Sequence, residues 1–511
     1  MAQPAIDNYL ERILMARVYD VAVETSLDVM PALSARTGNT VLLKREDTQP
    51  VFSFKLRGAY NCMVQLTPEQ RAKGVVAASA GNHAQGVALA AKKLGCVATI
   101  VMPATTPQIK ISAVERNGGV VILHGDSYSD AYEHSMSVVA ATGGTFVHPY
   151  DDPNVIAGQG TIGMELLRQC HDLDVIFVPV GGGGLAAGVA AYVKRLRPHV
   201  KIIGVEPVDA ATMHDSIAAG HRVVLPTVGL FADGVAVKQV GQETFRLCRD
   251  LLDEVILVDT DAMCAAIKDV FEATRSILEA AGALSLAGLK AWSAREGVTG
   301  KRLVAIASGA NMNFDRLRHI SERAELGEAR EAILAVRIPE VPGSLKRFCQ
   351  DFLEHRAITE FNYRFSDAHH AHIFVGLQVQ SRGDVHGLVT RLNLAGFATT
   401  DLTDNELAKG HIRHMVGGHA PPSTTTLNEK LYRFVFPERP GALLFFLECM
   451  GTKNWNISVF HYRNHGADYG RVLVGMQVPP EDDHAFQAFL DGVGYDWFDE
   501  RHNPVYKLFL A

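Results

Sequence analysis

Cysteine is scarce in this 511-residue chain, and basic residues are not in excess. The seven cysteines are widely spaced and form no C-x-x-C pair, which argues against a disulfide framework and a structural zinc site and favours a reducing compartment. Lysine and arginine total 49 against 56 acidic residues, so the net charge is −7, and no basic stripe marks a nucleic-acid binder. We therefore expect neither a bound metal nor a nucleic-acid partner.

Export and membrane signals are also missing. The first fifteen residues carry Asp7, Glu11 and Arg12, so they lack the apolar core of a signal peptide. Residues 175–193 contain no charge and approach a membrane span in length, but Pro179 and the four glycines at 181–184 would break a helix there. That stretch predicts a strand, a loop and a helix, and we expect the protein in the cytoplasm with no membrane partner.

Hydrophobic residues make up 47% of the chain, which is enough for a large core and excludes intrinsic disorder. Residues 1–320 alternate β-branched runs with helical stretches, for example at 126–140 and 262–279. This alternation is typical of an α/β domain whose mostly parallel sheet is covered by helices on both faces. The predicted strands are Thr40–Leu43, Val75–Ala78, Val97–Met102, Val120–Leu123, Val175–Val180, Ile202–Val205, Val255–Val258 and Leu303–Ala307.

Beyond a charged helical connector at 321–331, the sequence repeats itself at an offset of 98 or 99 residues. Three blocks carry the repeat in the same order: 339–345 with 437–443, 358–364 with 457–463, and 375–379 with 474–478. Each copy predicts a strand, a Pro-Gly turn, a helix, two strands and a helix, so we expect α+β modules at 332–404 and 427–498. Two copies are too few for a solenoid. A paired binding module and an inert oligomerisation domain both fit.

Lys55 is the first residue with the character of a reactive group. It lies in the segment Ser53-Phe54-Lys55-Leu56-Arg57-Gly58-Ala59. A lysine in a helical stretch is usually solvated, but two apolar neighbours near a helix start can partly desolvate this amine. Desolvation favours the neutral amine, which a Schiff-base lysine needs.

Two other segments place small residues at predicted strand ends. In Ser79-Ala80-Gly81-Asn82-His83, the Asn82 amide could donate to a phenolate or carbonyl oxygen. The alternatives are a tight turn with Asn82 as helix cap, and a His83 that merely packs against the strand. Ser308-Gly309-Ala310-Asn311 follows the last strand and is either part of a site or a plain turn into a helix.

A further segment of small residues is Gly181-Gly182-Gly183-Gly184-Leu185, which lies between a hydrophobic strand and the predicted helix Ala186–Leu196. Exposed N–H groups at a helix N-terminus make a phosphate cradle. No Gly-Lys-Ser/Thr follows, which excludes a Walker loop, and the contiguous glycines do not form the G-x-G-x-x-G dinucleotide fingerprint.

A Schiff-base lysine, a phosphate cradle without a nucleotide signature, an asparagine and a terminal serine together indicate pyridoxal 5′-phosphate. On these motifs the sequence closely resembles the biosynthetic threonine dehydratases, which belong to the tryptophan-synthase-β-like fold type II of pyridoxal-phosphate enzymes. The resemblance covers nearly the whole chain: a catalytic domain at 1–320, then two ACT-like regulatory modules. It implies two catalytic subdomains, conversion of L-threonine to 2-oxobutanoate and ammonia in isoleucine biosynthesis, inhibition by isoleucine, relief by valine, and a homotetramer.

The resemblance also implies a role for each motif residue. Lys55 would hold the cofactor as a Schiff base and remove the Cα proton, Asn82 would pair with the cofactor's 3′-oxygen, and Ser308 would face its pyridine nitrogen. The phosphate would bind at Gly181, Gly182, Gly183, Gly184 and Leu185. The substrate carboxylate would bind at Ser79, Ala80, Gly81, Asn82 and His83.

Four positions depart from related sequences. Ala310 replaces a glycine that many relatives carry, and Ala280 and Ala281 follow Glu279 where many have Pro-Ser, which leaves a cofactor role for Glu279 open. Serine racemases of this fold carry a similar motif, but they have a proton-donating serine where this chain has Ala80. Racemisation is therefore disfavoured.

Other functions fit the sequence less well. A catabolic serine/threonine dehydratase is the nearest alternative, but its short or single-module C-terminus does not match the duplication, and threonine synthase fits less closely still. An amino-acid sensor without turnover would not need Lys55, Asn82 and Ser308 together. A purely structural protein leaves the four glycines unexplained.

Overall fold

The computed structural model describes residues 7–339, 348, 351–352, 358–365, 370–414, 428–437, 445–446, 449–450, 455–463 and 469–509. The chain divides into two compact units, Met1–Ala324 and Glu325–Ala511, called unit 1 and unit 2 below. In the described part of the chain, no helix is long and apolar enough to cross a membrane. The uncharged stretch at 175–193 forms a strand, a glycine loop and a helix, as predicted.

The larger of two sheets in unit 1 has six strands in the order β1-β2-β10-β7-β8-β9. All neighbours in it pair in parallel except β1, which is antiparallel to β2. The strands are β1 (Leu27–Val29), β2 (Thr40–Lys44), β7 (Val175–Pro179), β8 (Lys201–Pro207), β9 (Glu254–Val258) and β10 (Arg302–Ile306).

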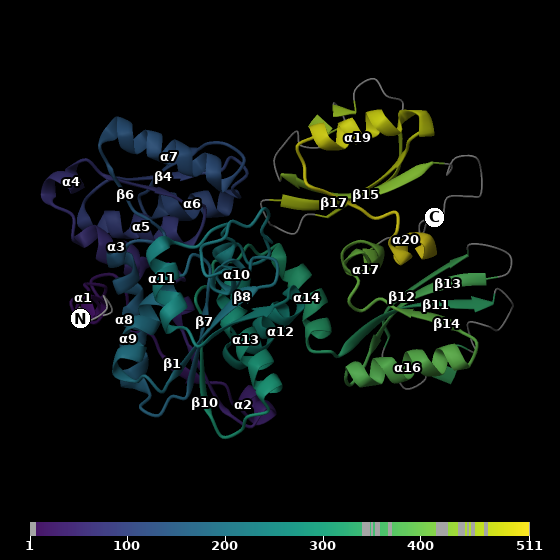
Figure 1. Ribbon diagram of the computed structural model, residues 1–511, viewed down its shortest axis with the longest axis horizontal. Helices are drawn as coiled ribbons and strands as arrows, with labels where there is room; N and C mark the ends of the chain where they lie inside the picture. Colours follow the sequence, from purple (N-terminus) through teal and green to yellow (C-terminus); the bar gives the residue numbers. More distant parts are fainter. Residues whose placement is uncertain are drawn as a thin grey trace. The chain divides into compact units, whose positions relative to one another are not determined.

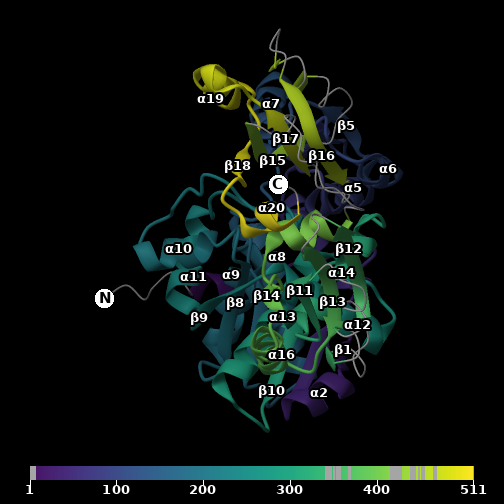
Figure 2. The same ribbon diagram turned by 90° about the vertical axis from the view of Figure 1, so that its right-hand side faces the viewer.

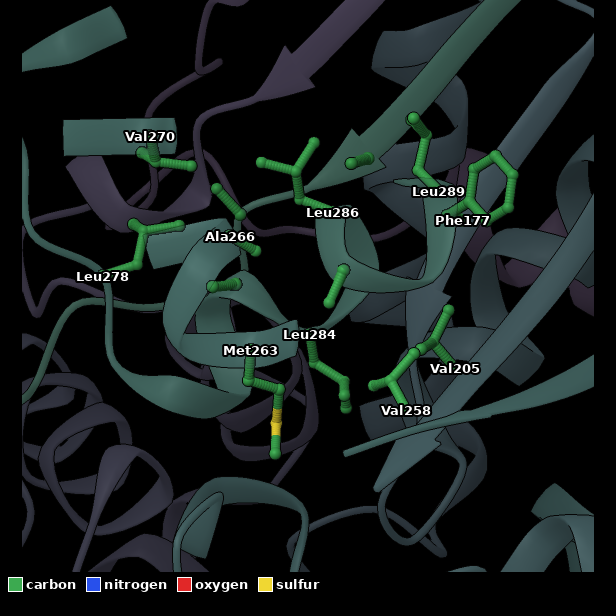
Figure 3. Close-up of a cluster of buried hydrophobic side chains, with 14 of the residues drawn as sticks. Phe177, Val205, Val258, Met263, Ala266, Val270, Leu278, Leu284, Leu286 and Leu289 are labelled. Carbon is green, nitrogen blue, oxygen red and sulfur yellow. The ribbon is translucent and has the colours of Figure 1, made fainter. Parts of the chain in front are cut away.

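Helices cover both faces of this sheet because its strands carry apolar side chains on both sides. On one face Phe177 and Val205 pack with Met263 and Leu284 of α12 (Thr260–Thr274) and α13 (Ala280–Glu296), as Figure 3 shows. The opposite face packs on α8 (Pro153–Gln169), α9 (Gly184–Leu196) and α11 (Gln242–Leu251). The predicted parallel sheet with two covered faces is confirmed.

The second sheet of unit 1 has four parallel strands in the order β5-β4-β3-β6 (the blue part in Figure 1). They are β3 (Val75–Ala78), β4 (Ala98–Met102), β5 (Val120–Leu123) and β6 (Thr145–Phe146). Its helices are α4 (Pro68–Ala72), α5 (Asn82–Leu94), α6 (Gln108–Arg116) and α7 (Tyr128–Thr142). Helix α3 (Lys55–Val64) packs on α5 and also on α8 of the larger sheet, so it joins the two subdomains.

The remaining elements of unit 1 are short. They are α1 (Asp7–Leu14), α2 (Pro31–Thr37), η1 (Glu46–Thr48), α10 (Thr212–Ala219) and η2 (Asp233–Val235), with α14 (Arg316–Gly327) crossing into unit 2.

The predicted helix at 262–279 is wrong at its C-terminal end. Helix α12 stops at Thr274 because Arg275 adopts a left-handed conformation with φ 60°. The chain then turns, and Glu279 becomes the residue before α13 instead of the last residue of α12.

The described residues of unit 2 form two four-stranded antiparallel sheets with the same strand order, β12-β13-β11-β14 and β16-β17-β15-β18. The first copy of the repeat forms β11 (Glu331–Pro339), β12 (Ile358–Phe365), β13 (His370–Gln378), α16 (Arg382–Leu394) and β14 (Ala398–Asp401). The second forms β15 (Glu429–Pro437), β16 (Asn456–Arg463), β17 (Tyr469–Gln477), η5 (Pro480–Asp482), α19 (Asp483–Gly492) and β18 (Trp497–Asp499).

The two copies agree in detail. A register shift interrupts β12 between 358 and 360, and an equivalent one interrupts β16 between 457 and 459. The fourth strands β14 and β18 were not predicted, and the predicted Pro-Gly turns lie outside the described residues. Both views show α16 against the green sheet (Figures 1 and 2), and its Leu388 and Leu392 are buried there.

The two sheets of unit 2 share a third apolar cluster. It includes Ile333 and Phe374 from the first sheet, Leu431 and Leu473 from the second, and Leu407 from α17 (Glu406–Gly410). The short elements η4 (Ile412–His414) and α20 (Pro504–Phe509) contribute as well. The repeat is therefore a paired module with a common core.

Candidate active site

One pocket in unit 1 brings together the residues that the sequence predicted to bind a cofactor. Lys55, Asn82 and Ser308 line it with Leu185 and the glycines 181–184. They lie at the starts of α3 and α5, between β7 and α9, and after β10, where loops of parallel sheets form ligand sites. The other lining residues are Phe54, Tyr150, Pro179, Gly234, Val235, Glu279 and Ala281.

Lys55 reaches this pocket because two distant segments pair. Ser53 and Gly309 form an isolated antiparallel bridge. The Phe54 N–H donates to the Ser308 carbonyl at 3.2 Å. The first turn of α3 is thus held beside the end of β10.

The Lys55 amine is poorly solvated. Its Nζ donates to the Pro149 carbonyl at 2.8 Å and lies 5.4 Å from the centre of the Phe54 ring. Burial lowers the pKa of Lys55 to about 8, although Glu279 opposes that shift. Its place at the positive end of α3 also disfavours the ammonium form. The neutral amine is therefore much more accessible near neutral pH than that of an ordinary lysine.

Arg57 anchors the helix that carries Lys55. Its guanidinium is fully buried and donates to both Glu46 and Glu165, with the shortest contact 2.6 Å from Nη1 to Glu165 Oε1. Lys44 Nζ lies 2.6 Å from Glu165 Oε2, so two cations and two carboxylates balance. Burial raises the pKa of Glu165, but Arg57 and Lys44 outweigh it and hold that pKa below its usual value.

Three glycines of the loop before α9, Gly181 to Gly183, stand where a larger residue would not fit. A Cβ on Gly181 would lie 2.8 Å from Val235 Cα, and one on Gly182 would lie 2.1 Å from Cγ of Tyr150. Gly183 has a φ of 94°, which other residues rarely adopt. The loop ends at the N-terminus of α9, whose first N–H groups have no acceptor within the helix. This geometry suits a phosphate.

Tyr150 is a pocket residue that the sequence did not reveal. Its ring lies against Gly182 and edge-on to His148, with 4.7 Å between ring centres. The neighbouring Asp151 carboxylate accepts from the first N–H groups of α11, and Thr244 on that helix donates its hydroxyl to the Gly182 carbonyl at 2.6 Å. Tyr150 follows strand β6, and a residue after a strand end is a candidate for a site. Because β6 has two residues, the sequence shows no strand pattern there, and the candidate is missed.

Asn82 does not cap a helix with its side chain. Gly81 is the residue before α5, and no side chain caps that end. The Asn82 amide instead donates to Glu279 Oε1 at 2.6 Å and accepts from Asn311 Nδ2 at 2.7 Å. The helix-cap alternative is therefore wrong, and Glu279 lines the pocket.

Ser308 is buried, and its hydroxyl makes a long 3.2 Å contact to the Ala281 carbonyl. A hydroxyl held this weakly can rotate toward the pocket. Ser308 presents a neutral polar group there, without a formal charge.

The residues predicted to bind the substrate carboxylate lie beside the pocket. Apart from Asn82, none of Ser79, Ala80, Gly81 and His83 lines it directly. Ser79 Oγ accepts from the Gly81 N–H at 3.2 Å, which shapes the turn between β3 and α5. His83 is buried with Nε2 2.8 Å from the Val147 carbonyl, and burial lowers its pKa to about 3, so its surroundings match a packed, neutral histidine.

Two family profiles match this chain. The pyridoxal-phosphate dependent enzymes match over residues 20–309. The C-terminal regulatory domain of threonine dehydratase matches twice, over 322–412 and 423–510, which correspond to the two modules of unit 2.

Full-length relatives are similar over almost the whole chain. The biosynthetic L-threonine dehydratase of Burkholderia multivorans is 58% identical over 99% of this chain and 100% of its own length. The biosynthetic L-threonine dehydratase of Escherichia coli is 54% identical over 98% of this chain and 97% of its own length. Among solved structures, threonine deaminase isoform 2 of Solanum lycopersicum is 52% identical, with a TM-score of 0.63 over 64% of this chain and 90% of that one. Maize serine racemase is 36% identical, with a TM-score of 0.58 over 61% and 95%.

Proposed function

This chain belongs to the biosynthetic threonine dehydratases, pyridoxal-phosphate-dependent lyases with a C-terminal regulatory domain, and we propose the parts that its own residues play in that activity. The family's reaction is the dehydration and deamination of L-threonine to 2-oxobutanoate and ammonia. One observation carries the assignment of residues: Lys55 and the N-terminus of α9 line the same pocket.

The pocket fits pyridoxal phosphate group by group. The cofactor needs an amine for its aldehyde, and Lys55 offers one whose pKa is lowered to about 8 by burial. It needs N–H donors for a dianionic phosphate, and the glycine loop 181–184 leads its backbone to the N-terminus of α9 with no side chains to cover the N–H groups. Asn82 would donate to the 3′-oxygen and Ser308 would face the ring nitrogen.

When bound, pyridoxal phosphate supplies an aldehyde that reacts with amines and a conjugated ring that accepts the electron pair left at the substrate Cα. Lys55 Nζ, as a neutral amine, takes the Cα proton of threonine. The β-hydroxyl leaves with one proton as water, which balances the proton taken from Cα. Hydrolysis of the released enamine, through its imine form, then consumes one water and gives 2-oxobutanoate and ammonia. Lys55 is the one catalytic residue in this proposal.

The neighbouring residues decide which reaction follows. Ser308 is a neutral group, so it would not hold a full positive charge on the ring nitrogen, and loss of the β-hydroxyl would then compete better than reprotonation. The turn from Ser79 to His83 would bind the substrate carboxylate through backbone N–H groups at the start of α5. Ala80 has no proton to give to the opposite face, which disfavours racemisation.

For unit 2 we propose binding of isoleucine as inhibitor and of valine as its antagonist. The common core of the two modules supports this assignment, because one ligand at the pair can shift both sheets together. Coupling to the pocket of unit 1 favours a symmetric assembly, and we propose a homotetramer. No disulfide joins the six cysteines that the structure describes, which suits the cytoplasmic location that we propose.

The direct test measures 2-oxo acid formation from threonine and from serine by the full-length protein, with and without isoleucine, and again after adding valine. We expect turnover of threonine, inhibition by isoleucine and recovery with valine. Cofactor binding without any 2-oxo acid would contradict the catalytic assignment. Turnover indifferent to isoleucine would contradict only the regulatory one.

A further inference from the structure

Glu279, Asn82 and Asn311 form a chain of hydrogen bonds along one wall of the pocket. Asn311 Nδ2 donates to the Val51 carbonyl and to Asn82 Oδ1, each at 2.7 Å. Asn82 Nδ2 donates in turn to Glu279 Oε1 at 2.6 Å. Glu279 is only 4% exposed, so its acceptor is not shared with bulk water.

The direction of this chain is fixed at one end by the backbone. A carbonyl oxygen can only accept, so the Asn311 atom facing Val51 must be the NH₂ group. Both N–H groups of Asn311 are then in use, and Asn82 must meet it with oxygen. The Asn82 NH₂ group consequently faces Glu279 with one N–H, and its second N–H remains for the pocket.

Reversing the Asn82 amide would break both contacts. Two NH₂ groups would face each other at Asn311, and two oxygens would face each other at Glu279. It would also turn a carbonyl oxygen toward any ligand oxygen in the pocket. Without these two neighbours the Asn82 amide would have no preferred orientation, because its oxygen and its NH₂ group are nearly equal in size and shape.

Glycine keeps the space that Glu279 needs. A Cβ on Gly309 would lie 2.5 Å from Glu279 Oε1 and 3.2 Å from Asn82 Nδ2. The Glu279 N–H also donates to the Gly309 carbonyl at 3.2 Å. Glycine at position 309 is thus explained by the carboxyl group that it borders.

We infer that Glu279 and Asn311 are positioning residues, which lock the Asn82 amide with its N–H toward the 3′-oxygen of the cofactor. The inference rests on the proposed cofactor contact of Asn82 and adds the reason why that contact has one direction. It also gives Glu279 a role that acts through Asn82, without contact to the reacting atoms.

Other charges around Glu279 do not alter this direction. Asp233 lies nearby, and Lys110 Nζ, 2.7 Å from Asp233, and Arg316 lie beyond it. Burial and Asp233 raise the pKa of Glu279 to about 7. A carboxylate accepts at Oε1, and a carboxylic acid protonated on its other oxygen accepts there too, so Asn82 is oriented in both states.

The test compares full-length variants by two measurements that do not depend on turnover. These are the affinity of the apoprotein for pyridoxal phosphate and the ratio of the visible to the near-ultraviolet band once it is bound. A donor to the 3′-oxygen favours its ionised form, which absorbs in the visible. We expect Glu279→Leu and Asn311→Leu each to lower the affinity about 10-fold, the effect of one hydrogen bond to a charged group, and to shift the ratio toward the ultraviolet.

Controls separate positioning from general damage. Glu279→Gln keeps an acceptor and should retain most of the affinity. Asn39→Ala removes another buried amide, one that bonds to Val298 and Ser293 away from the pocket, and should leave the band ratio unchanged. Because Glu279 acts through Asn82, adding Glu279→Leu to Asn82→Ala should cause no further loss.

The inference would be overturned if the affinity losses of Glu279→Leu and Asn82→Ala added up in the double variant. It would also be overturned if Glu279→Leu and Asn311→Leu both kept the band ratio of the wild type. If Glu279→Leu does not fold, Asn311→Leu tests the chain from its other end. An Asn82→Ala protein with unchanged affinity and spectrum would contradict the cofactor contact of Asn82 itself, a failure of the proposed site that is distinct from a failure of positioning.

Discussion

Arg57 and Glu165 form an ion pair inside unit 1, with 2.6 Å between Arg57 Nη1 and Glu165 Oε1 and no exposed surface on either side chain. Arg57 stands two residues after Lys55 in the same helix, and Glu165 lies on α8 of the larger sheet. The pair therefore fixes the lysine-bearing helix to the subdomain that carries the glycine loop. This explains why an arginine belongs to the segment around Lys55.

Replacing Arg57 by methionine should destabilise unit 1 strongly, because Glu46 and Glu165 would stay buried with Lys44 as the one cation left between them. The expected loss is about 3–5 kcal/mol of unfolding free energy, the usual cost of breaking a buried pair from one side. Urea unfolding at neutral pH measures it. Arg295→Met, at an exposed pair with Glu254, is the matched control and should cost less than about 1 kcal/mol.

The loss should also depend on pH in a definite direction. The pKa of Glu165 is lowered in the folded protein, so its contribution to stability is present above the ordinary carboxyl pKa near 4.5 and fades as the pH falls through the lower folded value. The difference between wild type and Arg57→Met should therefore be largest at neutral pH and shrink in acid. A constant difference across that range would contradict the ion-pair account.

Gly182→Ala should weaken cofactor binding because its methyl group would meet the Tyr150 ring at 2.1 Å. Overpacking of this kind costs about 1–3 kcal/mol, which corresponds to a loss of affinity of about 5- to 150-fold. Titration of the apoprotein with pyridoxal phosphate measures it.

Two further variants test whether the Tyr150 ring causes the loss of cofactor affinity in Gly182→Ala. If the Tyr150 ring is the obstacle, Tyr150→Ala combined with Gly182→Ala should bind better than the sum of the single effects predicts, by about 1 kcal/mol. Gly387→Ala, at a helical position with open space, should bind the cofactor like wild type. Strictly additive losses would show that Tyr150 does not set the requirement for glycine.

The rate at which the apoprotein takes up pyridoxal phosphate should follow the titration of Lys55. Only the neutral amine attacks an aldehyde, and burial lowers the pKa of Lys55 from 10.5 to about 8. The rate constant, followed by the visible band in stopped flow, should rise with pH up to about 8 and then level off. A blocked lysine in solution, the control, should keep accelerating well above that pH, and similar behaviour in the protein would contradict the desolvated amine.

Removing unit 2 should separate regulation from catalysis. A chain ending at about residue 324 should bind the cofactor and turn over threonine without responding to isoleucine. In the full-length protein we expect isoleucine and threonine to weaken each other's binding by the same factor, about 5- to 150-fold for typical coupling energies of ~1–3 kcal/mol. Isoleucine sensitivity in a folded, cofactor-bound truncated protein would place the effector site in unit 1.

The strands and the site loops could be predicted because their signals are local. Buried parallel strands such as β7 and β10 are continuous apolar runs, and Lys55, Asn82, Gly181–Gly184 and Ser308 all stand at strand ends or helix starts. The offset of the repeat likewise predicted two equal modules, and the identical strand orders confirm them.

The rest could not be predicted because it depends on residues far apart in the chain. Arg57 and Glu165 are 108 positions apart, and Glu279 and Asn82 are 197 apart, so no spacing pattern links them. The end of α12 depends on one left-handed residue, Arg275, which has no sequence signature of its own.

The most direct test of the central claim is to identify the amine that holds the cofactor. Borohydride reduction of the cofactor-bound protein fixes pyridoxal phosphate covalently to that amine, and peptide mass spectrometry locates it. The account predicts one labelled peptide, the one that carries Lys55. A label on Lys44 or Lys110, or no stoichiometric label at all, would contradict it.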